Sequence, residues 1–320
     1  MKLRRPFALT TIAALLGFSA SPRQKYGLEP AYQSLFTRNH LSTPCDPPPT
    51  TGARLELSSS NDPAHTVWRR DQMILPRADL PVFTMHLERS LLEISGDADA
   101  SDDYSVQLCA EAGAASESDA KALLEEIKMA FDNKILSLSM PEYVQERPSS
   151  SFLQVQAPLQ TPITLNGIYA AVRVIGVNAP VHLSTTHGRI TLLETTGDVD
   201  ARVESGIIDF SGRRGNVQLA ADWEINLNFT AQDFDGSLDA KAQGPVRVLL
   251  HSGFTSAFEV IVQRKSDFVC RADVCDRVSS HKRDGKWVFT FGSGDPSLHF
   301  TSLGGSVVMD NSDRLNPIYR

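Results

Sequence analysis

The residues most able to do chemistry in this sequence are four polar side chains that recur at a regular spacing. They follow one another at intervals of 18, 18 and 21 residues, each at the same place in a segment of similar pattern. If these segments stack as neighbouring strands about 4.8 Å apart, the outer two acids lie near 10 Å from each other. That distance is close to the carboxylate spacing of inverting glycosidases, about 6.5–9.5 Å. The four residues are His182, Asp200, Gln218 and Asp239.

A solvated surface explains the same four residues more simply than catalysis does. A stack of strands always has polar outward positions, and here Arg202 and Lys241 alternate with the acids and would keep them ionised. A second outward set, Thr191, Asp209, Asn226 and Arg247, offers no acid and base pair. The sequence also lacks the nucleophile-elbow, zinc-protease, phosphate-loop and dinucleotide motifs. We therefore expect no catalytic residues and no cofactor, and a carbohydrate-active enzyme is the alternative.

Metal binding has two weak candidates. The acidic turn over residues 96–103 could hold calcium, but it lacks the spacing and the closing Glu of an EF-hand. The pair Cys270 and Cys275 has zinc-ligand spacing, but no second ligand pair lies nearby. We expect no metal site at either place.

The four cysteines are better explained as disulfides of an exported protein. Three pairings are possible, and the close pair Cys270 and Cys275 is the most plausible clamp on one loop, which leaves Cys45 for Cys109. A clamp this short contributes roughly 2 kcal/mol, and the longer one roughly 4 kcal/mol.

Export is indicated by the first twenty-one residues. Cations at positions 2, 4 and 5 precede an apolar run over 7–18 and small residues at 19–21, which is the order of a secretory signal peptide. The run is too short to cross the ~30 Å core of a bilayer, and no later stretch of the sequence would cross it either. The pair Arg4 and Arg5 leaves the general and the twin-arginine routes open. We expect an extracytoplasmic location: the periplasm, the cell surface or the medium.

Charge excludes one class of partner. Removing residues 1–20 takes away three cations and no acids, which changes the net charge from −7 to −10. A chain this acidic repels phosphate backbones, so nucleic acid is not expected as a partner.

The fold prediction depends on a pattern that returns through residues 181–250. Paired segments with alternating apolar residues recur every 17 to 21 residues, the first strands from Val181, Val199, Val217 and Leu238, the second near Ile190, Ile208, Ile225 and Val246. Alternation predicts strands with one row inward, and this period predicts stacked coils that share a core. Gly188, Gly206 and Gly244 fall between the two strands of their coils, where we expect turns with positive φ. The sequence predicts an all-β, single-stranded β-solenoid, a β-helix-like stack of short coils.

Outside the coils, one helix is predicted over 116–131, where Ala120, Leu123, Leu124, Ile127 and Phe131 share a face and Ser116 with Asp119 fits a capping box. Order is expected to begin near Pro81. The predicted divisions are a signal peptide (1–20), a poorly structured Pro/Ser-rich lead-in (21–80), N-terminal strands with the helix (81–160), solenoid coils (161–312, closing with the alternating residues of 287–309) and a C-terminal tail (313–320).

The order of these elements resembles a known family. A strand at Leu91-Leu92-Glu93-Ile94-Ser95-Gly96, a short helix, a strand ending Ser139-Met140-Pro141, and coils of the type Gly-Asp-Val-Asp-Ala-Arg-Val-Glu-Ser-Gly are similar to the bacterial putative adhesin domain over roughly 83–310. The resemblance implies an envelope β-solenoid and carries no catalytic residues. We expect a non-catalytic binding or structural role at the cell envelope, with a protein or glycan partner. A signalling scaffold is a further alternative.

Overall fold

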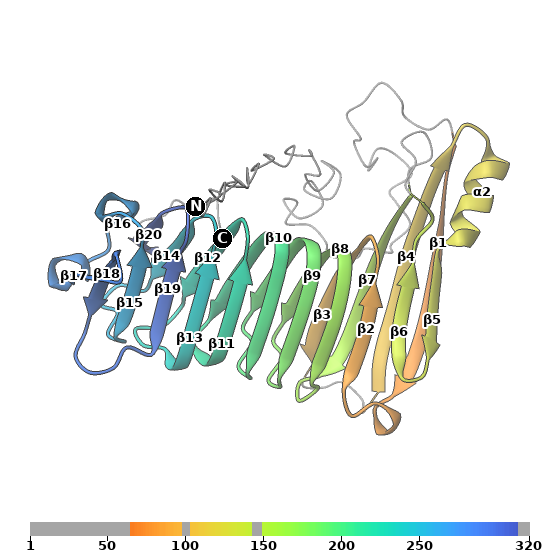
Figure 1. The fold of residues 1–320 in the computed structure, drawn as a ribbon. Coiled ribbons are helices and arrows are strands. Elements are labelled where there is room, and N and C mark those ends of the chain that lie inside the picture. The colour runs from red at the N-terminus through yellow and green to blue at the C-terminus, as the bar shows by residue number, and fades with distance from the viewer. Residues whose placement is uncertain (1–64, 98–102, 143–148, 313–320) are drawn as a thin grey trace, which may run out of the picture.

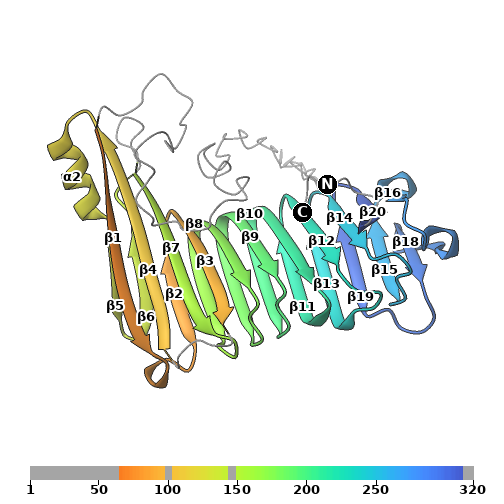
Figure 2. The ribbon, with the colours of Figure 1, turned by 180° about the vertical axis from the view of Figure 1, so that it is seen from behind.

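The computed structural model describes residues 65–97, 103–142 and 149–312. The described chain is all-β apart from one α-helix and three short 3-10 turns, and its twenty strands belong to one continuous sheet. The body is elongated, with the helix α2 at one end and strand β17 at the other (Figure 1). The view from behind shows a second layer of strands along the same axis (Figure 2). Among the described residues, no helix has the length and apolar character needed to cross a membrane.

The middle of the body is built from parallel strands in register. Val181 is the partner of Val199, Val199 of Val217, and Val217 of Leu238. In the second layer Ile190 pairs with Ile208, Ile208 with Ile225, and Ile225 with Val246. The strands are β8 (Ile163–Ile175), β9 (Val181–Leu193), β10 (Val199–Gly212), β11 (Arg214–Ala221), β12 (Glu224–Phe229), β13 (Asp235–Ala242) and β14 (Val246–Leu250).

The core lies between the two layers. Along each strand, buried residues alternate with exposed or half-buried ones, so that each strand contributes one inward row. Phe229 is 1% exposed and packs on the rings of Phe234, Phe254 and Phe300, with centroid distances of 5.5, 5.3 and 6.1 Å. Because neighbouring strands lie about 4.8 Å apart, the inward rows of successive strands join into one apolar interior.

Glycine is required at the corner between the two layers mainly because a Cβ atom has no room there, and less because the backbone needs a positive φ angle. Gly188 has φ of +136°, as predicted, but Gly206 and Gly244 do not have positive φ. A Cβ on Gly206 would lie 1.9 Å from the carbonyl oxygen of Gly188, and one on Gly244 would lie 1.7 Å from that of Trp223. The backbones of neighbouring segments therefore approach so closely here that no side chain fits.

The strand order at the N-terminal end differs from the order in the sequence. β2 and β3 lie between β8 and the pair β6 and β7, all with parallel pairing. Antiparallel strands then close the end: β4 on β7, β1 on β4, and β5 on β6. These elements are β1 (His65–Pro76), η1 (Arg77–Asp79), β2 (Phe83–Leu87), β3 (Ser90–Asp97), β4 (Asp103–Ala114), β5 (Lys128–Asp132), β6 (Ile135–Ser139) and β7 (Ser149–Pro158). The middle of the acidic turn, 98–102, lies outside the described residues.

The prediction that order begins near Pro81 is wrong, because β1 already starts at His65. Two inward positions of this strand carry charges, which hides its alternation. Arg69 and Asp71 pair with each other at 2.9 Å, and Arg69 donates to the carbonyl oxygens of Leu124 and Ile127 at the end of the helix. A cation there adds hydrogen bonds to carbonyl oxygens at the C-terminal end of the helix and interacts favourably with the negative end of the helix dipole.

The helix α2 (Glu117–Glu126) begins as predicted but ends five residues early. Ser116 is the N-cap and accepts a hydrogen bond from the backbone N–H of Asp119. The predicted last turn, including Phe131, belongs instead to β5. Asn133 and Lys134 both have positive φ and form the two-residue turn of a β5–β6 hairpin, and this turn draws Phe131 into the sheet.

The C-terminal end also departs from chain order. β19 and β20 insert between β13 and β14 on one side and β15 and β16 on the other, with parallel pairing throughout. β18 then pairs antiparallel with β15, and β17 pairs antiparallel with β18 to close the end. The elements are β15 (Phe258–Val262), η2 (Lys265–Asp267), β16 (Phe268–Cys270), η3 (Cys275–Arg277), β17 (Ser279–Arg283), β18 (Lys286–Phe291), β19 (Leu298–Ser302) and β20 (Val307–Asn311).

The predicted disulfide between Cys270 and Cys275 is confirmed. It joins β16 to η3 beside this end of the body. Cys109 lies half-buried on β4 and is not a free thiol. Its expected partner Cys45 lies outside the described residues.

Candidate binding face

The four predicted polar residues lie side by side in the first layer. Asp200 is the register partner of both His182 and Gln218, and Gln218 is the partner of Asp239. All four alternate with buried neighbours, so their side chains point outward. We call the outward surface of residues 181–187, 199–205, 214–221, 235–242 and 298–302 the open face.

Two further residues extend this row, and sequence reasoning missed them. Asp239 pairs with His299 on β19, and His299 pairs with Glu259 on β15. The row therefore runs His182, Asp200, Gln218, Asp239, His299 and Glu259, and we call it the polar column. The inserted position of β19 hid this continuation, because chain order places Glu259 before His299. The alternation Leu298, His299, Phe300 was the available signal.

Half of the side chains of the polar column have no partner among the described residues. His182, Gln218 and Asp239 make no hydrogen bond or ion pair with any described residue. Asp200 accepts a hydrogen bond from Nε of its neighbour Arg202 at 3.2 Å, which confirms one expected pair, whereas Lys241 makes no such pair with a described acid. This leaves donors and acceptors on the open face available to a ligand.

Glu259 closes the column at the C-terminal end. Its side chain is 11% exposed, Arg283 donates to Oε1 at 2.7 Å, and His299 Nδ1 lies 3.8 Å from the same oxygen. The carboxylate of Glu259 raises the pKa of Arg283, first through this hydrogen bond and then through charge attraction. The contact fixes Arg283 against the end of the open face.

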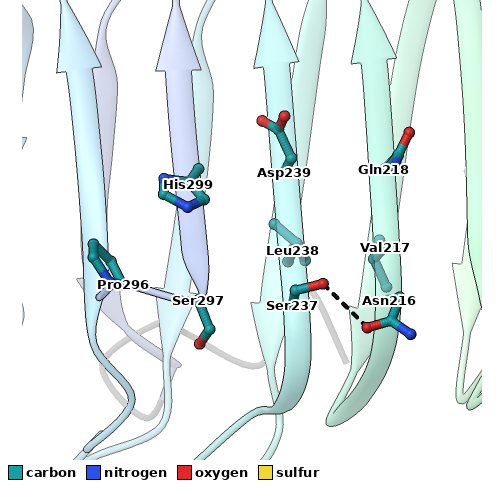
Figure 3. A pocket seen from close by; sticks show the side chains of 9 residues that line it. All are labelled: Asn216, Val217, Gln218, Ser237, Leu238, Asp239, Pro296, Ser297 and His299. Atoms are coloured by element: carbon teal, nitrogen blue, oxygen red, sulfur yellow. Dashed lines mark hydrogen bonds between the residues drawn. The ribbon is translucent and has the colours of Figure 1, made fainter. Parts of the chain in front are cut away.

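A shallow hollow of about 240 Å³ lies over β11, β13 and β19 (Figure 3). Gln218, Asp239 and His299 stand in one row along it, and Asn216, Ser237 and Ser297 stand in a second row below them. Ser237 donates to Asn216 at 3.1 Å, and Asn216 donates to Asp198 at 2.9 Å. A second hollow of about 370 Å³ on the same face is lined by Arg202, Glu204, Asp222, Lys241 and Gln243 among others.

The opposite layer has outward side chains that satisfy one another. We call the outward surface of residues 189–193, 207–212, 224–229 and 246–250 the paired face. Asp209 accepts hydrogen bonds from Arg189, from Asn226 at 2.9 Å and from Thr191 at 3.4 Å. Arg247 pairs with Glu224 at 3.1 Å, and Asn228 donates to Ser211 at 3.3 Å. The two faces therefore differ in how much of their polar surface is free to bind another molecule.

The two Asp residues of the polar column lie at the separation that the sequence predicts. Asp200 and Asp239 are separated by the strand that carries Gln218, so their backbones lie about 9.6 Å apart at two strand spacings. Asp200 is tied to Arg202, and the hollow beside Asp239 is shallow. Among the described residues, no group of His, Cys, Asp and Glu is arranged to hold a metal ion.

Comparison with known proteins gives structural neighbours only. No family model matches the chain, and no curated protein matches it. A putative cell adhesion protein from Clostridium sporogenes is 11% identical, with a TM-score of 0.29 over 76% of this chain and 98% of that one. A putative adhesin from Bacteroides fragilis is 12% identical, with a TM-score of 0.36 over 77% and 97%. A putative adhesin from Parabacteroides distasonis is 9% identical, with a TM-score of 0.33 over 76% and 97%.

Neighbours with these identities and TM-scores do not indicate what this chain binds. The resemblance expected from the sequence is confirmed to this extent: the similar solved structures are described as putative adhesins.

Proposed function

We propose that this protein is an exported, non-catalytic binding protein, built as a β-solenoid, whose open face binds a glycan at the cell envelope. The observation that carries the proposal is the difference between the faces. On the paired face, Asp209 alone accepts three hydrogen bonds from neighbouring side chains. On the open face, His182, Gln218 and Asp239 have no partner among the described residues. A folded chain that pairs its polar groups on one side and leaves them free on the other has a surface suited to a polar ligand.

The chemistry of the open face favours a glycan over a protein. Sugar hydroxyls both donate and accept, which suits the mixture of amide, imidazole, carboxylate and hydroxyl groups in the two rows of the hollow. Protein interfaces depend on large aromatic or Arg anchors set in well-packed pockets. Of the large apolar side chains exposed in the described chain, one lies at the edge of the open face, where Tyr169 stacks on His187 with a centroid distance of 4.5 Å. The others lie outside it, at Trp68, Ile74, Val82, Ile168 and Trp223.

Different observations support export and the solenoid architecture. The signal pattern of residues 1–21 and the Cys270–Cys275 disulfide support an oxidising compartment. Parallel, in-register pairing at offsets of 18 to 21 residues supports coils that stack along one axis. We propose the division that the sequence predicts, into a signal peptide, a lead-in, an N-terminal part with the helix, a coiled part and a C-terminal tail, except that the lead-in ends before His65.

The test is retention on a panel of immobilised envelope glycans, with reducing-sugar release measured in parallel. We expect wild-type protein to be retained by at least one glycan without releasing sugar from it. The double variant Gln218→Ala/His299→Ala should bind at least tenfold more weakly, because it removes two members of the polar column. The matched variant Asn228→Ala removes a side chain of the paired face and should bind like wild type. Release of reducing ends, or equal loss in both variants, would contradict the proposal.

A further inference from the structure

The C-terminal end of the body carries a charge opposite to that of the whole chain. Residues 264–286 contain seven Lys and Arg and four Asp, a local charge of +3 in a chain of −7. Part of this positive charge is neutralised within the fold: Arg264 pairs with Asp267 at 3.1 Å, and Arg283 pairs with Glu259. Lys265, Lys282 and Lys286 have no ion-pair partner among the described residues.

Two of these lysines meet on one aromatic ring. Lys265 Nζ lies 5.1 Å from the ring centroid of Trp287, and Lys282 Nζ lies 5.3 Å from the same centroid. The two ammonium groups are therefore no further apart than the sum of these distances. Lys282 is the cross-strand partner of Trp287, and Lys286 is the partner of Arg283, so these four residues belong to the β17–β18 hairpin. Lys265 belongs to η2.

The ring itself is held in place. Trp287 is half-buried, stacks beside Phe289 at 6.3 Å, and continues the inward row of β18 toward the end of the core. The aliphatic parts of the two lysine side chains cover this open end of the core. Long uncharged side chains would cover it equally well, so packing alone does not explain the two charges. β18 lies between β15 and β17, so Lys265 and Lys282 reach the ring of Trp287 from the sides of two different strands. The indole ring attracts each ammonium group but does not neutralise its charge, and a polyanion that spans the ring would pair with both.

We infer that Lys265, Lys282 and Lys286 around Trp287 form a second binding site, which holds the anionic groups of an acidic polysaccharide. A carboxylate or sulfate is the chemical class that pairs with unneutralised ammonium groups. A polymer that carries many carboxylates or sulfates can contact both ammonium groups beside Trp287 at once, whereas a single small ion cannot. The polysaccharide as the source of the anion rests on the proposed function: Arg283 joins this end to Glu259, the last member of the polar column, so one polymer could reach both sites.

The test measures binding of dextran sulfate to the full chain, with neutral dextran as the uncharged control. Trp287 is one of three tryptophans, so Trp68→Phe/Trp223→Phe leaves it as the single fluorescent reporter. We expect a saturable change in its emission with dextran sulfate and none with neutral dextran. The double variant Lys265→Gln/Lys282→Gln should bind immobilised dextran sulfate at least tenfold more weakly than wild type, measured by retention. Lys128→Gln/Lys134→Gln, which removes two exposed cations at the opposite end, should leave it unchanged.

Three results would overturn the inference. Equal loss in both lysine pairs would mean general attraction to a polyanion. Equally tight binding of inorganic sulfate would mean a small-ion site, and tighter binding to phosphatidylglycerol vesicles would mean a membrane contact. A thermal melt of each variant shows that it is folded. Because Gln218 and His299 lie outside this site, retention of neutral glycans can succeed while this test fails, which separates the two proposals.

Discussion

The close approach of β9 and β10 at the corner between the two layers leads to a specific prediction for Gly206. A Cβ at this position would lie 1.9 Å from the carbonyl oxygen of Gly188 and 2.6 Å from Cγ1 of Val203. The obstacle is mainly backbone, so Gly206→Ala must push β10 away from β9 by more than 1 Å and stretch the hydrogen bonds between them. Overpacking of this kind costs about 3 kcal/mol. For a domain of this size that corresponds to a fall in Tm of about 6–12 °C.

Gly304→Ala is the matched control. The atom nearest to its added Cβ is the carbonyl oxygen of Gln243 at 3.1 Å, which a shift of a few tenths of an ångström would relieve. Neither Gly206 nor Gly304 has positive φ, so backbone strain enters neither comparison. We expect the control to change the unfolding free energy by less than about 1 kcal/mol, since alanine also restricts the unfolded chain. Thermal and urea unfolding of both variants give the answer. Equal stability of the two variants would refute the close approach of coils at this corner.

Three further predictions address the stack, the clamp and an acidic side chain. Deleting residues 197–214 joins Thr196 to Gly215 and lets Val181 pair with Val217, so this variant should stay folded when checked by circular dichroism. Deleting residues 197–205 should cause aggregation. Equal solubility of the two deletion variants would count against stacked coils. Cys270→Ser/Cys275→Ser should lose about 2 kcal/mol in urea unfolding, and an unchanged midpoint would exclude a stabilising clamp. The backbone N–H of Gly253 and the side chain of Asn311 lower the pKa of Asp273 below its ordinary 3.8, so its contribution is complete above that pH and is lost as pH falls through the lower folded value. The stability difference between wild type and Asp273→Asn should therefore narrow below pH 3.8, and a constant difference would contradict this assignment.

The pairings in the middle of the body could be predicted because the chain is regular there. The turn residues that precede each strand align Val181, Val199, Val217 and Leu238, and each is the register partner of the next. Alternation also placed His182, Asp200, Gln218 and Asp239 on the outward side. Local pattern and sheet register agree in this region because each strand pairs with the strand one coil away in the sequence.

The two ends could not be predicted in the same way. β19 inserts beside β13, sixty residues away in register, and nothing in the alternation of Leu298 and Phe300 specifies that neighbour. β1 was missed because Arg69 and Asp71 occupy inward positions and satisfy each other and the helix. Phe131 fitted the helical face by spacing, but the hairpin turn at Asn133 and Lys134 decides its place. In each case a tertiary contact overrides the local pattern.

Amide hydrogen exchange with a retained glycan tests the central claim most directly, because it reports which face the ligand covers. Residues 181–187, 199–205, 214–221, 235–242 and 298–302 form the open face, and 189–193, 207–212, 224–229 and 246–250 form the paired face. We predict that the glycan slows exchange in peptides of the first set and leaves those of the second unchanged. Slowing confined to the paired face, or spread equally over both, would contradict the account.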